Sequence, residues 1–211
     1  MTMSTALHKA LKITAVVLSD VFSPLLMATY AMAVALWLTP MRALPVGIRA
    51  WSTIGVFFIT AVLPAAMVAY LMHKGHVSDA SISDRRQRAV PFAFTVFCYI
   101  GAAFFIAALH APSWMVRFLA AAAVAATIEL FISYVWKISA HTAGIAGMAG
   151  FVFWLAQRGA LVIDGLSAIS IMFMLTGLVA WARLFLHRHT VLQTLAGAVL
   201  GFGVMLAAMA F

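Results

Sequence analysis

Seven long apolar segments dominate the sequence and constrain its fold more than any other feature. They are residues 13–38, 51–72, 91–110, 114–136, 142–157, 161–186 and 191–211. A stretch of about 20 apolar residues crosses a bilayer as an α-helix, because backbone polar groups in hydrocarbon must be satisfied within the segment. The sequence therefore predicts an all-α integral membrane protein, a polytopic bundle of six or seven transmembrane helices. We expect residues 1–211 to form a single transmembrane domain.

Two of these segments are irregular. The first carries Asp20 and Pro24, and the fifth is short, so we expect one of them to be broken or partly interfacial. Basic residues precede the first segment, as in a signal peptide, but the apolar run continues for about 26 residues without a clear cleavage site. We therefore expect a membrane anchor and not a removed peptide.

Composition agrees with a membrane protein. Of the 211 residues, 66% are hydrophobic and 9% charged, against about 45–50% and about 25% in soluble domains. The net charge of +8 indicates either basic flanks on the cytoplasmic side or an anionic substrate, and we expect no nucleic-acid partner. The single cysteine, Cys98, excludes an intrachain disulfide.

Three polar clusters interrupt the apolar pattern, and each follows an even-numbered segment. They occupy residues 73–91, 137–142 and 183–193. If the count of seven segments holds, all three emerge on the same face of the membrane. We therefore expect them to form one shared site.

The clusters contain the residue types that phosphate ester chemistry needs. These are Arg85, Arg88, Ser139, His141, Arg183 and His189. Guanidinium groups match phosphate oxygens bidentately and keep their charge. One imidazole can attack phosphorus while a second protonates the departing oxygen.

The order of these residues resembles the type 2 phosphatidic acid phosphatase superfamily. Its motifs are K-x6-R-P, P-S-G-H and S-R-x5-H-x3-D. The second motif resembles "ISAH" at residues 138–141, and the third resembles "ARLFLHRHTVLQ" at residues 182–193, where Arg183 and His189 have the family spacing. The first is loosest: "DRRQRAVP" at residues 84–91 is similar to a D-R-x-x-R-x-x-P form of small bacterial members. The resemblance covers about residues 74–203, within a phosphatase-like core of about 74–211.

The resemblance implies a role for each matching residue. His189 would be the nucleophile that forms a phosphohistidine, and His141 the general acid. Phosphate ligands would be Arg183, Ser139, and at least one of Arg85 and Arg88. Lys137 would replace the missing first-motif lysine. The family uses no metal, and we expect no cofactor.

One departure bears on activity. Gln193 stands where the family has the aspartate that orients the nucleophile, and an amide orients without supplying charge. The sequence therefore leaves open an active lipid phosphate phosphatase, slowed by Gln193, or a catalytically lapsed scaffold or binding protein of the same fold. A third alternative is a small transporter built on the intramembrane acids Asp20 and Glu129.

The resemblance implies a substrate with its tail in the bilayer and its phosphate at the site. Phosphatidic acid, phosphatidylglycerol phosphate and polyprenyl pyrophosphate all remain candidates. It also implies the bacterial plasma membrane, whereas the face that carries the site and the oligomeric state stay open. The glycines of residues 144–150, with Gly197 and Gly201, predict close helix packing.

Overall fold

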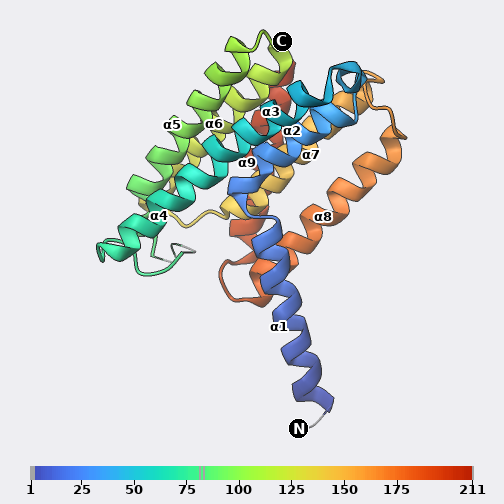
Figure 1. Ribbon diagram of the computed structural model, residues 1–211. Helices are drawn as coiled ribbons and strands as arrows, with labels where there is room; N and C mark the ends of the chain where they lie inside the picture. The colour runs from blue at the N-terminus through green and yellow to red at the C-terminus, as the bar shows by residue number, and fades with distance from the viewer. Residues whose placement is uncertain (1–2, 81, 83, 211) are drawn as a thin grey trace.

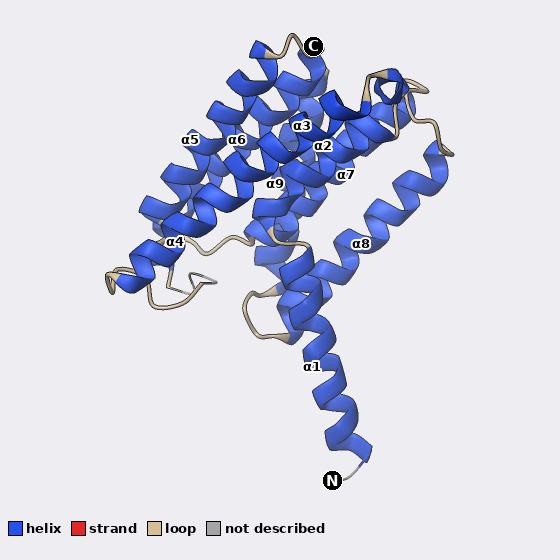
Figure 2. Ribbon diagram, viewed as in Figure 1, coloured by secondary structure: helices blue, strands red, loops and turns tan. Residues whose placement is uncertain are grey.

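The computed structural model describes residues 3–80, 82 and 84–210, and within them the secondary structure is helical throughout (Figures 1 and 2). The long helices are α1 (Met3–Val21), α2 (Pro24–Trp37), α3 (Val46–Phe57), α4 (Leu63–His73), α5 (Ala89–Ala108), α6 (Ser113–Val135), α7 (Ala140–Gln157), α8 (Gly165–Phe185) and α9 (Val191–Met209). Three short helical turns join them: η1 (Pro40–Ala43), η2 (Phe58–Val62) and η3 (Arg85–Gln87). The predicted all-α architecture is confirmed.

Among the described residues, five helices are long and apolar enough to cross a membrane, and a sixth span results if α1 and α2 count as one bent segment. The five are Val46–His73, Ala89–Ala108, Ser113–Val135, Gly165–Phe185 and Val191–Met209. The structure therefore gives five or six candidate spans, against the six or seven expected from the sequence. The predicted span that does not qualify is α7. Its ends carry His141 and Gln157, and its sequence is rich in alanine and glycine. It lies in the interior of the bundle, where a helix needs no lipid-facing surface.

The first apolar segment is broken, which confirms one of the two expected irregularities. α1 and α2 meet at an angle of 62°. Pro24 stands at the first turn of α2, where its missing N–H costs nothing, but it cannot continue α1. Figure 1 shows α1 leaving the body of the bundle beyond this elbow.

The second apolar segment is a continuous helix with one irregular turn. α3, η2 and α4 together run over Val46–His73, and η2 is a π-helical turn. Pro64 lies in the first turn of α4, just after η2. The wider hydrogen-bonding pattern of η2 allows the helix to continue past a residue that has no N–H to donate.

α7 forms the centre of the molecule. It packs most extensively on α9 and also contacts α8 and α2. At the end far from the polar clusters, the rings of Phe118 and Phe151 lie 4.6 Å apart. Trp154 donates its indole N–H to the carbonyl of Met209 at 2.8 Å, which ties the ends of α7 and α9 together. The opposite ends of the same two helices carry the candidate site.

Candidate active site

Ser139 begins α7 and joins it to α9. Its side chain caps the helix by accepting from the backbone N–H of Thr142 at 3.5 Å, and it is fully buried. The backbone N–H of Ser139 donates to the carbonyl oxygen of Gln193 at 3.3 Å. The first turns of α7 and α9 are therefore held together by the backbone.

The end of α8 explains the spacing between Arg183 and His189. His187 adopts a left-handed conformation (φ 53°), and the N–H of Arg188 reaches back to the carbonyl of Arg183 at 3.0 Å. This is the pattern of a Schellman helix end. The chain reverses there and returns His189 to the neighbourhood of Arg183, with both residues buried. His187 points outward and is exposed, so the burial agrees with the family spacing in singling out His189.

Gln193 orients the His189 ring. In the capping box that starts α9, Oε1 of Gln193 accepts from the N–H of Thr190 at 3.2 Å, and it also lies 3.1 Å from Nδ1 of His189. Because an amide oxygen only accepts, this contact places the ring proton on Nδ1. The lone pair of Nε2 is then free to act on a ligand.

Two glycines on α9 bring the two helix starts into direct contact. A Cβ atom on Gly197 would lie 2.5 Å from the carbonyl oxygen of Ser139 and 2.6 Å from Oγ1 of Thr142. A Cβ on Gly201 would collide with the carbonyl oxygen of Ala143. The expected glycine packing is confirmed, and no larger residue fits at these two positions without displacing α7.

Arg88 brings the first polar cluster to the same place. It is buried at the start of α5, and its Nε donates to the carbonyl of Ile82 at 3.0 Å. Its Nη1 donates to the carbonyl of Ile138, one residue before Ser139, at 3.3 Å. The structure thus joins all three polar clusters through Arg88, Ser139 and the end of α8.

Arg85 does not join this group. It is exposed, and its Nη1 donates to the carbonyl of Tyr134 at 2.8 Å on the outside of the α6 end. Of the two arginines that the sequence offered as phosphate ligands, the geometry favours Arg88. The two side chains reach different backbone carbonyls, that of Tyr134 at the end of α6 and that of Ile138 just before α7.

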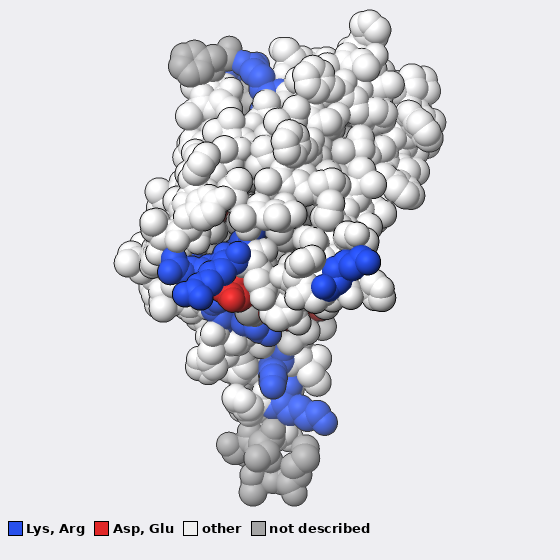
Figure 3. All heavy atoms as spheres, turned by 90° about the vertical axis from the view of Figure 1, so that its left-hand side faces the viewer, with Lys and Arg blue, Asp and Glu red and all other residues white. Residues whose placement is uncertain are grey.

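Positive charge accumulates around the two histidines. Burial, followed by the charges of Arg183, Lys137 and Arg88, lowers the pKa of His189 to about 3. The pKa of Lys137 is lowered by burial and by the neighbouring arginines Arg88, Arg183 and Arg188. Figure 3 shows Lys and Arg gathered across the lower part of one face of the molecule, below an almost uncharged body. Such a cluster favours an anionic ligand.

Arg183 offers this ligand an unused donor. The residue is 5% exposed, and its Nε has no hydrogen-bond partner among the described residues. A buried donor without an acceptor costs free energy, about 1–3 kcal/mol for an uncharged group and more for a charged one. An anion bound beside Arg183 would remove this penalty.

His141 lies in the first turn of α7, within electrostatic range of His189 and Arg183. Its ring is hydrogen-bonded to the backbone of Ser19, near the end of α1. The carbonyls in the last turn of a helix lack intrahelical partners, and the elbow after α1 leaves this one available. The sequence did not indicate Ser19, because its contribution is a backbone group that only the helix break exposes.

The two intramembrane acids lie beside arginines and not beside each other. Asp20 shares a surface hollow with Arg183 and Arg188, and its charge acts on Arg183. Glu129 is buried in α6, where its charge acts on Arg88. Both acids therefore border the basic cluster, each beside a different arginine.

In the described part of the chain, no three His, Cys, Asp or Glu side chains gather closely enough to hold a metal ion. Comparisons of the chain with protein-family models, with curated proteins and with solved structures find no match.

Proposed function

We propose that the protein is a membrane phosphatase that hydrolyses a lipid phosphate or pyrophosphate through a phosphohistidine intermediate. One observation carries the proposal: a neutral, oriented histidine lies beside a buried arginine with a free donor. Its Nδ1 contacts Gln193 at 3.1 Å, and its Nε2 has no hydrogen-bond partner among the residues that the structure describes. The low pKa of His189, about 3, keeps that nitrogen unprotonated at neutral pH.

The proposed reaction has two steps. In the first, Nε2 of His189 forms a bond to phosphorus, the bond from phosphorus to the lipid oxygen breaks, and His141 gives that oxygen a proton. Burial, followed by the charges of Arg183 and His189, lowers the pKa of His141 to about 3, so His141 would carry this proton only beside the negative charge of the bound substrate. In the second, His141 takes a proton from water, whose oxygen attacks the phosphohistidine and releases inorganic phosphate. Arg88, Arg183 and Lys137 would stabilise the negative charge on the phosphoryl oxygens. The buried hydroxyl of Ser139 would supply a further donor.

Phosphate release from phosphatidic acid and from a polyprenyl pyrophosphate by the purified protein tests the proposal. His189→Ala should abolish release and also remove any trapped acid-labile phosphoenzyme. His187→Ala is the matched control, because this histidine lies two residues away and is exposed. It should retain full activity. Equal release by His189→Ala and the parent protein would refute the assigned nucleophile.

A second candidate is a binding protein of the same fold that has lost catalysis. The neutral side chain at Gln193 favours it, because the charge that stabilises an imidazolium-like intermediate in triad-type enzymes is missing. In that case the protein would bind lipid phosphates without releasing phosphate, and Arg183→Ala would abolish binding. Binding without release identifies this candidate, and release above the His189→Ala background identifies the enzyme.

A further inference from the structure

Positive charge lies at both ends of α7, and only one end belongs to the candidate active site. α7 has 18 residues, which at 1.5 Å per residue makes it about 27 Å long. A hydrocarbon core is about 30 Å thick. The N–H of Val162, in the loop after α7, donates to the carbonyl of Leu38 at the end of α2 at 2.9 Å. In Figure 1 this end of the bundle lies away from α1. It therefore faces the headgroups of the opposite leaflet.

A pocket of about 420 Å³ opens at this end of the bundle. Its volume lies within the range of about 300–1,000 Å³ that is usual for ligand sites. The chain after α2, the start of α6 and the end of α7 line it, and we call it the far-face pocket. Its wall includes Met41, Trp114, Arg117, Trp154, Leu155 and Arg158.

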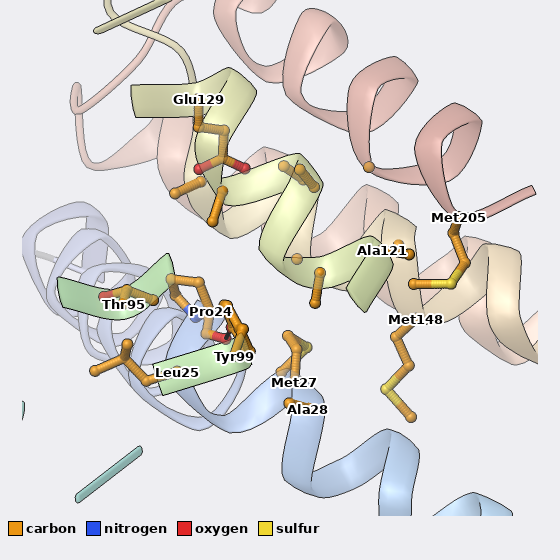
Figure 4. A pocket seen from close by; sticks show the side chains of 18 of the residues that line it. Pro24, Leu25, Met27, Ala28, Thr95, Tyr99, Ala121, Glu129, Met148 and Met205 are labelled. Atoms are coloured by element: carbon orange, nitrogen blue, oxygen red, sulfur yellow. Dashed lines mark hydrogen bonds between the residues drawn. The ribbon is translucent and has the colours of Figure 1, made fainter. Parts of the chain in front are cut away.

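The cavity beside the first turn of α7 differs from the far-face pocket in size and charge. It measures about 110 Å³, and α2, α5, α6, α7 and α9 line it mostly with alanine, glycine and methionine. Figure 4 shows Glu129 and Met205 at opposite ends of the lining side chains. Among the described residues of this wall, Glu129 alone is charged. The cavity does not suit an anion, whereas the far-face pocket presents two arginines and, in its described wall, no acid.

The two arginines of the far-face pocket have hydrogen-bond donors to offer. The guanidinium carbon of Arg158 lies 4.2 Å from the centre of the Trp154 ring, a cation–π contact that uses none of its N–H groups. Nε of Arg117 is buried and has no hydrogen-bond partner among the described residues. An unpaired buried donor costs free energy. Two such guanidiniums suit the oxygens of a phosphate group.

The acids of the chain leave this pocket positively charged. Four of the five act on arginines of the basic cluster, as Asp20 does on Arg183. The fifth, Asp164, caps α8 by accepting from the N–H of Ser167 at 2.7 Å, and it does not line the pocket. The charge of Arg117 and Arg158 therefore remains for a ligand.

We propose that the far-face pocket binds the phosphate headgroup of an anionic phospholipid from the leaflet opposite to the candidate active site. Arg117 lies four residues into α6, about 6 Å from its start, which is close to the headgroup level. Tryptophan is typical of this level, and the ring centres of Trp114 and Trp154 lie 6.0 Å apart there. Basic pockets between transmembrane helices bind lipid headgroups. The proposal does not depend on phosphatase activity.

Lipid binding to the purified, delipidated protein in detergent tests this proposal. By native mass spectrometry, dioctanoyl phosphatidylglycerol should bind at least tenfold more tightly than dioctanoyl phosphatidylcholine, which has no net charge. Arg158→Gln should remove this preference. Arg42→Gln is the matched control and should keep it, because Arg42 is exposed at the same end but does not line the pocket. Arg158 is exposed as well, so both variants should fold.

Arg117→Gln should remove the same preference from the α6 side of the pocket. An unchanged preference in both Arg117→Gln and Arg158→Gln would overturn the proposal. Loss of the preference in Arg42→Gln would also overturn it, since binding would then follow total charge. Millimolar inorganic phosphate should leave the lipid bound. Displacement of the lipid by inorganic phosphate would show that the pocket takes a soluble anion and not a lipid headgroup.

Arg183→Ala separates this site from the candidate active site. The substitution removes a buried arginine of the basic cluster and should leave the preference for phosphatidylglycerol intact, whether or not the parent protein releases phosphate. Loss of the preference in Arg183→Ala, with retention in Arg158→Gln, would assign the bound lipid to the candidate active site and overturn the far-face proposal.

Discussion

The two sides of α7 are both built from small residues, yet one is closed and the other hollow. Toward α9, glycine lies opposite backbone, so that Gly201 meets the carbonyl of Ala143 directly. Toward α5 and α6, the same helix faces alanines of α6 as well as the bulky Tyr99 and Phe118, and a cavity remains between the helices. Small residues on both helices therefore do not suffice for close packing, which here occurs where glycine lies directly against backbone.

The largest expected effect is the difference in stability between alanine substitutions of one glycine on each side of α7. Gly201→Ala places a methyl group against backbone that cannot move aside, and should destabilise the protein by about 3 kcal/mol or more. Gly144→Ala, on the cavity side, would place a methyl group 3.0 Å from Cγ of Met27 and 3.3 Å from Cα of Pro24. These approaches are looser than the collision at Gly201, so the substitution should cost less. Thermal unfolding in detergent measures both.

Gly203→Ala is the control for helix propensity, since nothing lies within 4 Å of a Cβ at that position. It should leave the melting temperature unchanged or slightly higher. A Gly201→Ala protein as stable as Gly203→Ala would show that the closed side is not closely packed.

Gly197→Ala should affect activity more than stability. Its methyl group would press on the carbonyl of Ser139 and the hydroxyl of Thr142, displacing the start of α7 relative to His189. A misplacement of about 1 Å costs about 100-fold in rate. We expect a loss of that order in kcat, with folding retained. Unchanged kcat in a folded variant would place the reacting groups elsewhere.

Gln193→Glu should raise both the pKa of His189 and the activity of the site. The substitution keeps the capping box and adds a carboxylate at Nδ1 of His189. A negative charge favours the imidazolium, so the pKa of His189 should rise from about 3 toward the ordinary value of about 6.5. Nitrogen NMR of labelled histidine measures this shift, and kcat should rise about tenfold at pH 7.

The pKa of His189 also determines how activity changes as the pH falls. The parent His189 stays neutral from pH 8 down to about pH 4, so it causes no loss of activity in that range. In Gln193→Glu, protonation should begin to remove the nucleophile as the pH falls toward 6. Identical histidine titrations in the two proteins would contradict the contact between residues 189 and 193.

Asp20→Asn should have the smallest effect. Asp20 is exposed and acts on Arg183 from the α1 elbow, so solvent screens much of its charge. We expect a loss of a few-fold in kcat with KM nearly unchanged, measured by steady-state phosphate release. A loss as large as that of His189→Ala would give Asp20 a direct part in the chemistry.

The sequence predicted the helical membrane bundle and the meeting of three polar clusters because both follow from local patterns. Apolar runs set the helices, and the arginine-to-histidine spacing fits one helix end. It did not separate Arg85 from Arg88, since that choice depends on which backbone carbonyls the two side chains reach in the folded bundle. It also gave no sign of the cavity, because a hollow depends on which side chains face α7 from four other helices.

Gln193 both caps α9 and orients the ring of His189. Activity should therefore be lost at the temperature at which the first turn of α9 frays. The single amide oxygen of Gln193 serves both the N–H of Thr190, the N-cap residue of α9, and the ring of His189. Heating should loosen the first turn of α9 before the bundle melts. The ring would then lose its direction while the fold persists, so inactivation should set in several degrees below unfolding and reverse on cooling.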